Sequence, residues 1–102
     1  MTKVRLGHLD FIIREMDHVN AKDSYGLYVA EAQEIHLSKG MTPRRQAEVL
    51  MHEILHGLVD HYNLAHILGD KEEPVVRGLA LGLATAIRDN QRLFADIVKA
   101  LK

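Results

Sequence analysis

Two histidines and a glutamate in this chain have the spacing that suits metal-assisted hydrolysis. His52, Glu53 and His56 form the pattern H-E-x-x-H. On an α-helix, residues four apart lie one turn apart on the same face, so both imidazoles can bind one ion. Imidazole nitrogen is a preferred ligand of Zn²⁺. Glu53 lies about 100° further round the helix, where it can act as a general base on metal-activated water. The motif therefore predicts a zinc-dependent hydrolase.

A third metal ligand is expected outside this motif, because a catalytic zinc site usually has three protein ligands and one open position. Glu72 and Glu73 follow the motif and stand at the start of the next predicted helix. A helix that returns antiparallel to the first can bring either carboxylate to the ion. His66, just beyond the motif helix, is a further candidate. The residues alone leave these three alternatives open.

Other polar side chains near the motif could support such a site. Asp60 follows His56 by one helical turn and could accept a hydrogen bond from its second ring nitrogen. Tyr28, His61 and Tyr62 could donate a hydrogen bond to a developing oxyanion. The ordinary expectation for each of these three is a surface or half-buried residue without a catalytic role.

The motif needs a long helix to carry it, and the sequence predicts one. Thr42 is a good N-cap and Pro43 suits the first helical position. Apolar residues at helical spacing then continue to about His61. The two histidines of the motif therefore fall in the middle of a helix that buries one of its faces.

Two further helices should follow. One opens at Pro74 and ends near residues 89–90, and residues 93–101 form a last amphipathic helix. Gly78 and Gly82 lie inside the first of these helices. Since each glycine costs about 1 kcal/mol relative to alanine in a helix, we expect both to allow close packing against another helix. These glycines and the apolar last helix could also support a homo-oligomer.

Short strands are expected before the helices. Residues 10–16 favour a strand, residues 26–30 and 33–38 favour an antiparallel hairpin, and residues 17–24 favour a turn. Strands followed by helices indicate an α+β fold, with a small N-terminal antiparallel sheet, the H-E-x-x-H helix and one or two packing helices. At this length we expect a single domain over residues 1–102.

The composition excludes several classes of protein. Thirteen basic and fourteen acidic residues give a net charge of -1, which argues against a nucleic-acid partner. No apolar run approaches the ~18 residues of a membrane helix, so we expect no membrane segment. The absence of cysteine excludes thiolate metal sites and disulfides, and it fits a cytoplasmic location.

Taken together, these features resemble a known family of enzymes. A strand hairpin, an H-E-x-x-H helix and a second helix with an early glutamate are similar to a minimal gluzincin-type metallopeptidase. The similarity is closer to the ImmA/IrrE family of phages and mobile elements. In that family the third ligand opens the pattern E-x-x-A-N-x-F-A, which residues 73–80 match in outline, with Arg77 in place of Asn. The resemblance therefore implies Glu73 as the third ligand.

The resemblance also implies a function. The chain would be a zinc metallopeptidase in which His52, His56 and Glu73 hold the metal and Glu53 is the base. Its substrate would be a protein or peptide, such as a transcriptional regulator. The substrate could align along an edge strand near residues 33–38 by strand addition. The alternative is a phage-type adaptor or binding module with a structural or vestigial metal site, and a hydrolase of a non-peptide substrate is a third possibility.

Overall fold

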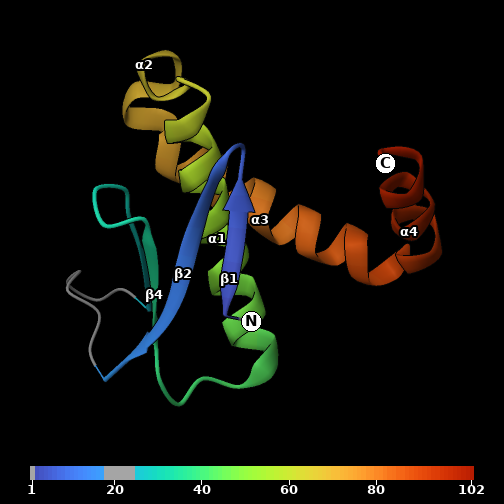
Figure 1. The fold of residues 1–102 in the computed structure, drawn as a ribbon, viewed down its shortest axis with the longest axis horizontal. Coiled ribbons are helices and arrows are strands. Elements are labelled where there is room, and N and C mark those ends of the chain that lie inside the picture. The colour runs from blue at the N-terminus through green and yellow to red at the C-terminus, as the bar shows by residue number, and fades with distance from the viewer. Residues whose placement is uncertain (1, 18–24) are drawn as a thin grey trace.

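The strands precede the helices along the chain, as the sequence predicts (Figure 1). A computed structural model describes residues 2–17 and 25–102. The four strands are β1 (Lys3–Leu6), β2 (Leu9–Met16), β3 (Gly26–Val29) and β4 (Glu34–Ser38). The helices are α1 (Pro43–His61), α2 (Ala65–Leu68), the 3-10 helix η1 (Gly69–Lys71), α3 (Glu72–Asp89) and α4 (Gln91–Ala100). The α+β class is confirmed. Most of the expected turn, residues 18–24, lies outside the described part of the chain.

The four strands form one mixed sheet in the order β1-β2-β4-β3. The predicted hairpin is confirmed, because β3 and β4 pair antiparallel with Tyr28 opposite Ile35. The expectation of an entirely antiparallel sheet is wrong, because β4 pairs parallel to β2. The second strand of the hairpin, rather than the first, lies beside β2, and it runs in the same direction. β3 is therefore an edge strand and β4 lies inside the sheet.

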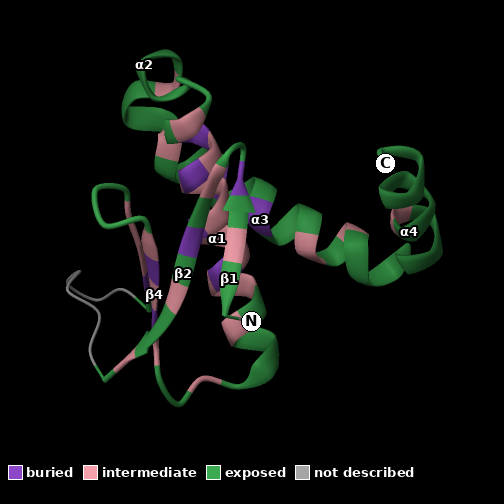
Figure 2. Ribbon diagram, viewed as in Figure 1, coloured by how far each residue is buried: buried purple, intermediate pink, exposed green. Residues whose placement is uncertain are grey.

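Helix α1 covers one face of this sheet. Ile35 and Leu37 of β4 are fully buried and form a hydrophobic cluster with Leu50 of α1. Helix α3 packs on another side of α1 and buries Val76 and Ala80. Figure 2 shows the buried residues in the sheet, in α1 and in the first half of α3, whereas the second half of α3 and all of α4 have none. Helix α1 is thus held from two sides, which fixes the direction of the side chains it carries.

The ends of α1 follow from its capping residues. The Thr42 hydroxyl accepts a hydrogen bond from the backbone N–H of Arg45 at 3.2 Å, and Pro43 is the first helical residue. After the helix ends at His61, Asn63 takes the left-handed conformation with φ 58°, which asparagine tolerates and which closes many helices. The predicted bounds of this helix are confirmed.

The second half of α3 and all of α4 extend away from the sheet (Figure 1). Helix α3 begins at Glu72, two residues before the predicted start, because Pro74 fits in a first turn where its missing N–H costs no hydrogen bond. A Cβ atom at Gly78 or Gly82 would meet no other atom within 4 Å. The expected close packing at these glycines is therefore wrong. No helix in the described ranges has the length and apolar character that crossing a membrane requires.

Candidate metal centre

His52 and His56 lie side by side in the middle of α1. Their ring centroids are 4.9 Å apart, and their Nε2 atoms are 3.2 Å apart. Both side chains are only partly exposed. The helix buries Leu50, Gly57 and Val59 elsewhere on its surface, so its packing leaves the two imidazoles directed toward α3. The Nε2 atoms of both rings therefore point to one position.

Glu73, at the start of α3, completes this group. Its Oε1 lies 2.9 Å from Nε2 of His52, and its Oε2 lies 2.8 Å from Nε2 of His56. One ligand atom from each of the three residues lies within 4.8 Å of the others, and this is the only such group of at least three residues in ranges 2–17 and 25–102. Two imidazoles and one carboxylate are a donor set that suits a catalytic zinc ion. His52, His56 and Glu73 could thus form a metal site.

Glu72 contacts the opposite side of the His56 ring. Its Oε2 lies 2.6 Å from Nδ1 of His56. A carboxylate on Nδ1 keeps the proton there and leaves Nε2 free to bind a metal, which is the usual arrangement behind a histidine ligand. We considered Asp60 as a possible acceptor for this ring, and the structure places Glu72 there instead. Asp60 instead accepts a hydrogen bond from the Tyr28 hydroxyl at 2.8 Å.

Glu53 is the one buried charged residue in the described part of the chain, with 7% of its surface exposed. Burial raises the pKa of its carboxyl, the charge of His56 opposes that rise, and the charge of Glu73 adds to it. The backbone N–H of Tyr28 donates a hydrogen bond to the carboxylate. A Cβ atom at Gly26 would come within 3.0 Å of Glu53 Cγ, so glycine is needed where β3 passes this side chain. Glu53 is thus held beside the three converging side chains without joining them.

Burial also governs the charge of His52. It lowers the pKa of the imidazole, and the charges of His56 and Arg77 lower it further, against the opposing charge of Glu73. A lowered pKa favours the neutral ring, which is the form that binds metal ions. The protonation state of His52 near neutral pH is therefore the one that a metal site requires.

A groove passes over this group between β3, α1 and α3. One cavity of about 370 Å³ extends from the group toward Tyr25 and Arg45, and another of about 620 Å³ extends toward Tyr28 and Asp60. Five residues line both cavities: Gly26, His52, Glu53, Glu73 and Arg77. The candidate metal site is therefore open to an extended molecule from two directions.

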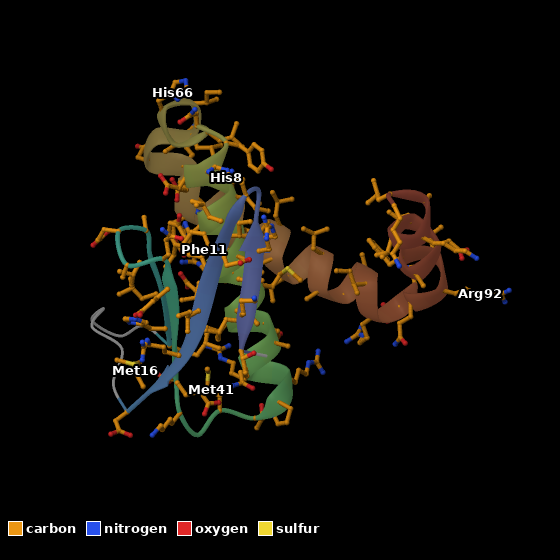
Figure 3. All side chains as sticks on the ribbon, in the orientation of Figure 1. His8, Phe11, Met16, Met41, His66 and Arg92 are labelled. Atoms are coloured by element: carbon orange, nitrogen blue, oxygen red, sulfur yellow. The ribbon has the colours of Figure 1, made fainter. Side chains whose placement is uncertain are left out.

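The remaining candidates from the sequence lie elsewhere. His66 is exposed on α2 and does not belong to the converging group (Figure 3). His61 packs over Gly7 and its ring lies 5.2 Å from that of His8. Tyr62 is exposed and contacts the His61 ring. None of these three lines either cavity of the groove.

Sequence reasoning missed two features of the groove. Arg77 lines both cavities, although the sequence singled it out only as a departure from a family pattern. Glu72 contacts His56, although the sequence considered it only as a metal ligand. Its position directly before Glu73, at a helix start, was the available signal. The direction of each carboxylate depends on how α3 packs against α1, which the local sequence does not encode.

This group of side chains could hold a metal ion, and the family match supports a metallopeptidase-like domain. The chain belongs to the family of IrrE N-terminal-like domains, a peptidase family whose sequence model matches residues 7–82. That range includes the H-E-x-x-H motif and Glu73, and it supports a peptidase-type enzyme at the level of the family. The resemblance to ImmA/IrrE proteins is thereby confirmed. Searches of curated proteins and of solved structures found no match.

Proposed function

We propose that this protein is a zinc-dependent peptidase. His52, His56 and Glu73 would hold Zn²⁺, and Glu53 would act as the general base. The main observation behind the proposal is that one ligand atom from each of these three side chains lies within 4.8 Å of the other two, with Glu53 buried beside them. Membership of a peptidase family supports the same reaction class. Zinc is proposed over other metals because two imidazoles and one carboxylate are common zinc ligands in catalytic sites.

Each residue of the group has a separate task in this proposal. A bound zinc ion would polarise the scissile carbonyl and lower the pKa of water. Glu72 would hold the His56 ring through Nδ1 so that Nε2 keeps its direction. Glu53 would take a proton from the attacking water and pass it to the leaving amine. The raised pKa of Glu53 suits this double task, because a base that releases its proton again works best with a pKa nearer the working pH.

The peptide substrate would lie along β3. We expected the substrate-binding edge near residues 33–38, but those residues belong largely to β4, which is paired on both sides. β3 is the outer strand, and Gly26 and Tyr28 line the groove beside Glu53. An extended peptide that adds to a strand edge gains backbone hydrogen bonds without a requirement for one sequence. This placement favours a protein or peptide substrate.

The identity of the substrate is inferred from the resemblance alone. We propose a transcriptional regulator as the substrate, in a phage or mobile-element context. The absence of cysteine is compatible with the reducing cytoplasm. A nucleic-acid partner is not part of the proposal, because the net charge of -1 offers no surplus of basic residues.

The zinc-loaded protein and its Glu53→Gln variant, incubated with a diverse peptide library, provide the test. Mass spectrometry would identify the cleaved bonds. We expect the wild type to cleave peptides and Glu53→Gln to be slower by about 10²–10⁴-fold, with its zinc retained. Glu31→Gln, an exposed carboxylate in the turn before β4, is the matched control and should cleave normally. No cleavage by the zinc-loaded wild type would favour the alternative, a binding module with a structural or vestigial metal site.

A further inference from the structure

Arg77 lies one helical turn after Glu73 on α3 and faces the same groove. It lines both cavities, so its side chain borders the centre of the groove rather than one end. Its Nη2 atom is 3.7 Å from Oε1 of Glu73, which is longer than a hydrogen bond. The side chain is 67% exposed. The guanidinium therefore forms an exposed ion pair with Glu73, but at this distance its N–H donors are not held in a hydrogen bond to that carboxylate.

Tyr28 and Arg45 also border the groove, but each of them has another contact. The Tyr28 hydroxyl donates to Asp60 at 2.8 Å, and its pKa is raised to about 12 by burial and by that carboxylate. Arg45 lines only one cavity and lies over the Tyr25 ring, 5.1 Å from its centroid. Among the residues that the structure describes, Arg77 is the one cation that lines both cavities.

The charge of Arg77 opposes the binding of a cation nearby. The positive charge of Arg77 acts on the candidate metal site, because it contributes to the lowered pKa of His52. A guanidinium in this place therefore does not serve metal affinity. It suits a negative charge that forms beside the metal site, since arginine stays charged at all working pH values and offers several N–H donors.

We propose that Arg77 is a catalytic residue whose guanidinium donates a hydrogen bond to the carbonyl oxygen of the scissile peptide bond. The inference rests on the proposed peptidase function. When water adds to the carbonyl carbon, its proton passes to Glu53 and the π electrons of the carbonyl move to the oxygen. Arg77 stabilises that developing negative charge. An electron pair on the oxygen then re-forms the C=O bond, the pair of the C–N bond leaves with the amine, and the amine nitrogen receives the proton from Glu53.

The test compares two ligands that differ in shape at the reacting carbon. One is a peptide with a tetrahedral, anionic phosphonate at the cleavage position, and the other is the same peptide with its ordinary amide. Binding is measured on zinc-loaded Glu53→Gln protein, which does not consume the amide, with and without Arg77→Ala. We expect Arg77→Ala to weaken phosphonate binding by about 10²-fold, while binding of the amide peptide and of zinc does not fall. Arg77→Lys should recover part of the loss, because the charge returns without the forked donors.

Arg88→Ala is the matched control, because Arg88 is an exposed arginine of α3 that pairs with Asp89 and lines neither cavity. It should leave phosphonate binding unchanged. Equal weakening of both ligands, loss of zinc in Arg77→Ala, or no effect on the phosphonate would overturn the role of Arg77. In those cases the proposed peptidase still stands if the wild type cleaves peptides. A zinc-loaded wild type that neither binds the phosphonate nor cleaves peptides contradicts both proposals.

Discussion

At the scale of single residues, Glu72 and Glu73 stand next to each other and contact different atoms of His56. Glu73 lies against Nε2, on the side of the converging group, and Glu72 lies against Nδ1 on the opposite side. Adjacent helical residues point about 100° apart, so the two carboxylates can reach opposite sides of one ring. The proposed site thus separates a metal ligand from a residue that orients a ligand.

This separation predicts different effects for the two carboxylates. Glu72→Ala should weaken zinc binding by about 10–100-fold and still leave a stoichiometric site at high zinc concentration. Competition with a chelator of known affinity would measure the change. Glu72→Gln, which keeps a hydrogen-bond acceptor for the Nδ1 proton, should lie between Glu72→Ala and the wild type. A complete loss of zinc in Glu72→Ala would mean that Glu72 is itself a ligand.

Tyr28 gives a pH-dependent prediction at the same scale. Burial raises the pKa of its phenol to about 12, with further contributions from the hydrogen bond and charge of Asp60. A raised pKa means that the folded state favours the neutral phenol. This contribution to stability is therefore complete below about pH 10, the unfolded value, and is lost as the pH rises toward 12.

An alkaline absorbance titration of the wild type, minus that of Tyr28→Phe, isolates this phenol. We expect its midpoint at about 12. Asp60→Asn should lower the midpoint, because it removes the negative charge, but not fully to 10, because burial persists. A midpoint that is unchanged in Asp60→Asn would contradict the pairing of Tyr28 with Asp60.

At the scale of elements, two helical glycines provide a matched pair. A Cβ atom at Gly57 of α1 would lie 2.6 Å from Leu6 Cδ1 and 3.1 Å from Tyr28 Cε1, whereas a Cβ atom at Gly78 of α3 would meet nothing within 4 Å. Gly57→Ala should therefore destabilise the fold by about 1–3 kcal/mol through overpacking. Gly78→Ala should stabilise it by about 0.5–1 kcal/mol. Denaturant unfolding of the metal-free variants would measure both changes, and a destabilising Gly78→Ala would contradict the open surface of α3.

Some elements of the fold could be predicted from the sequence, and others could not. The bounds of α1 were predictable, because Thr42, Pro43 and the apolar spacing are local signals. Strand β1 (Lys3–Leu6) was not predicted, because a strand of four residues carries little pattern. The parallel pairing of β2 with β4 was also missed, because strand order depends on contacts between distant parts of the chain.

The candidate site was predictable to a similar degree. The relative position of His52 and His56 is fixed by the helix that carries them, so it does not depend on how that helix packs against the rest of the fold. The direction of Glu72 and the position of Arg77 over the groove depend on the crossing of α3 and α1, and the sequence alone could not supply them. The metal-binding and catalytic roles of these residues stay predictions.

At the scale of the whole molecule, α4 is separated from the candidate site by the length of α3. It begins after α3 ends at Asp89, and the converging glutamate lies at the opposite end of α3 (Figure 1). No residue of α4 is buried. Removal of residues 91–102 should therefore leave zinc affinity unchanged. Chelator competition on the shortened chain tests this, and a large loss of affinity would show that α4 supports the site.

The prediction of a homo-oligomer rests partly on the apolar residues of helix α4. Leu93, Ile97, Val98 and Leu101 are exposed near the end of the chain, and apolar patches of this kind often mark interaction surfaces. Oligomerisation stays a prediction. The shortened chain offers its test by sedimentation, because an oligomer held by α4 would become monomeric, whereas an unchanged state would exclude α4 as the contact.

The zinc content of the purified protein decides whether His52, His56 and Glu73 form a metal centre. Mass spectrometry of the native protein, after zinc is added and unbound metal is removed, would give the number of ions per chain. We expect one zinc ion per chain, lost in His56→Ala and in Glu73→Ala and kept in His66→Ala, the control on α2. A wild type that holds no zinc, or variants that keep the ion, would contradict the proposed metal centre.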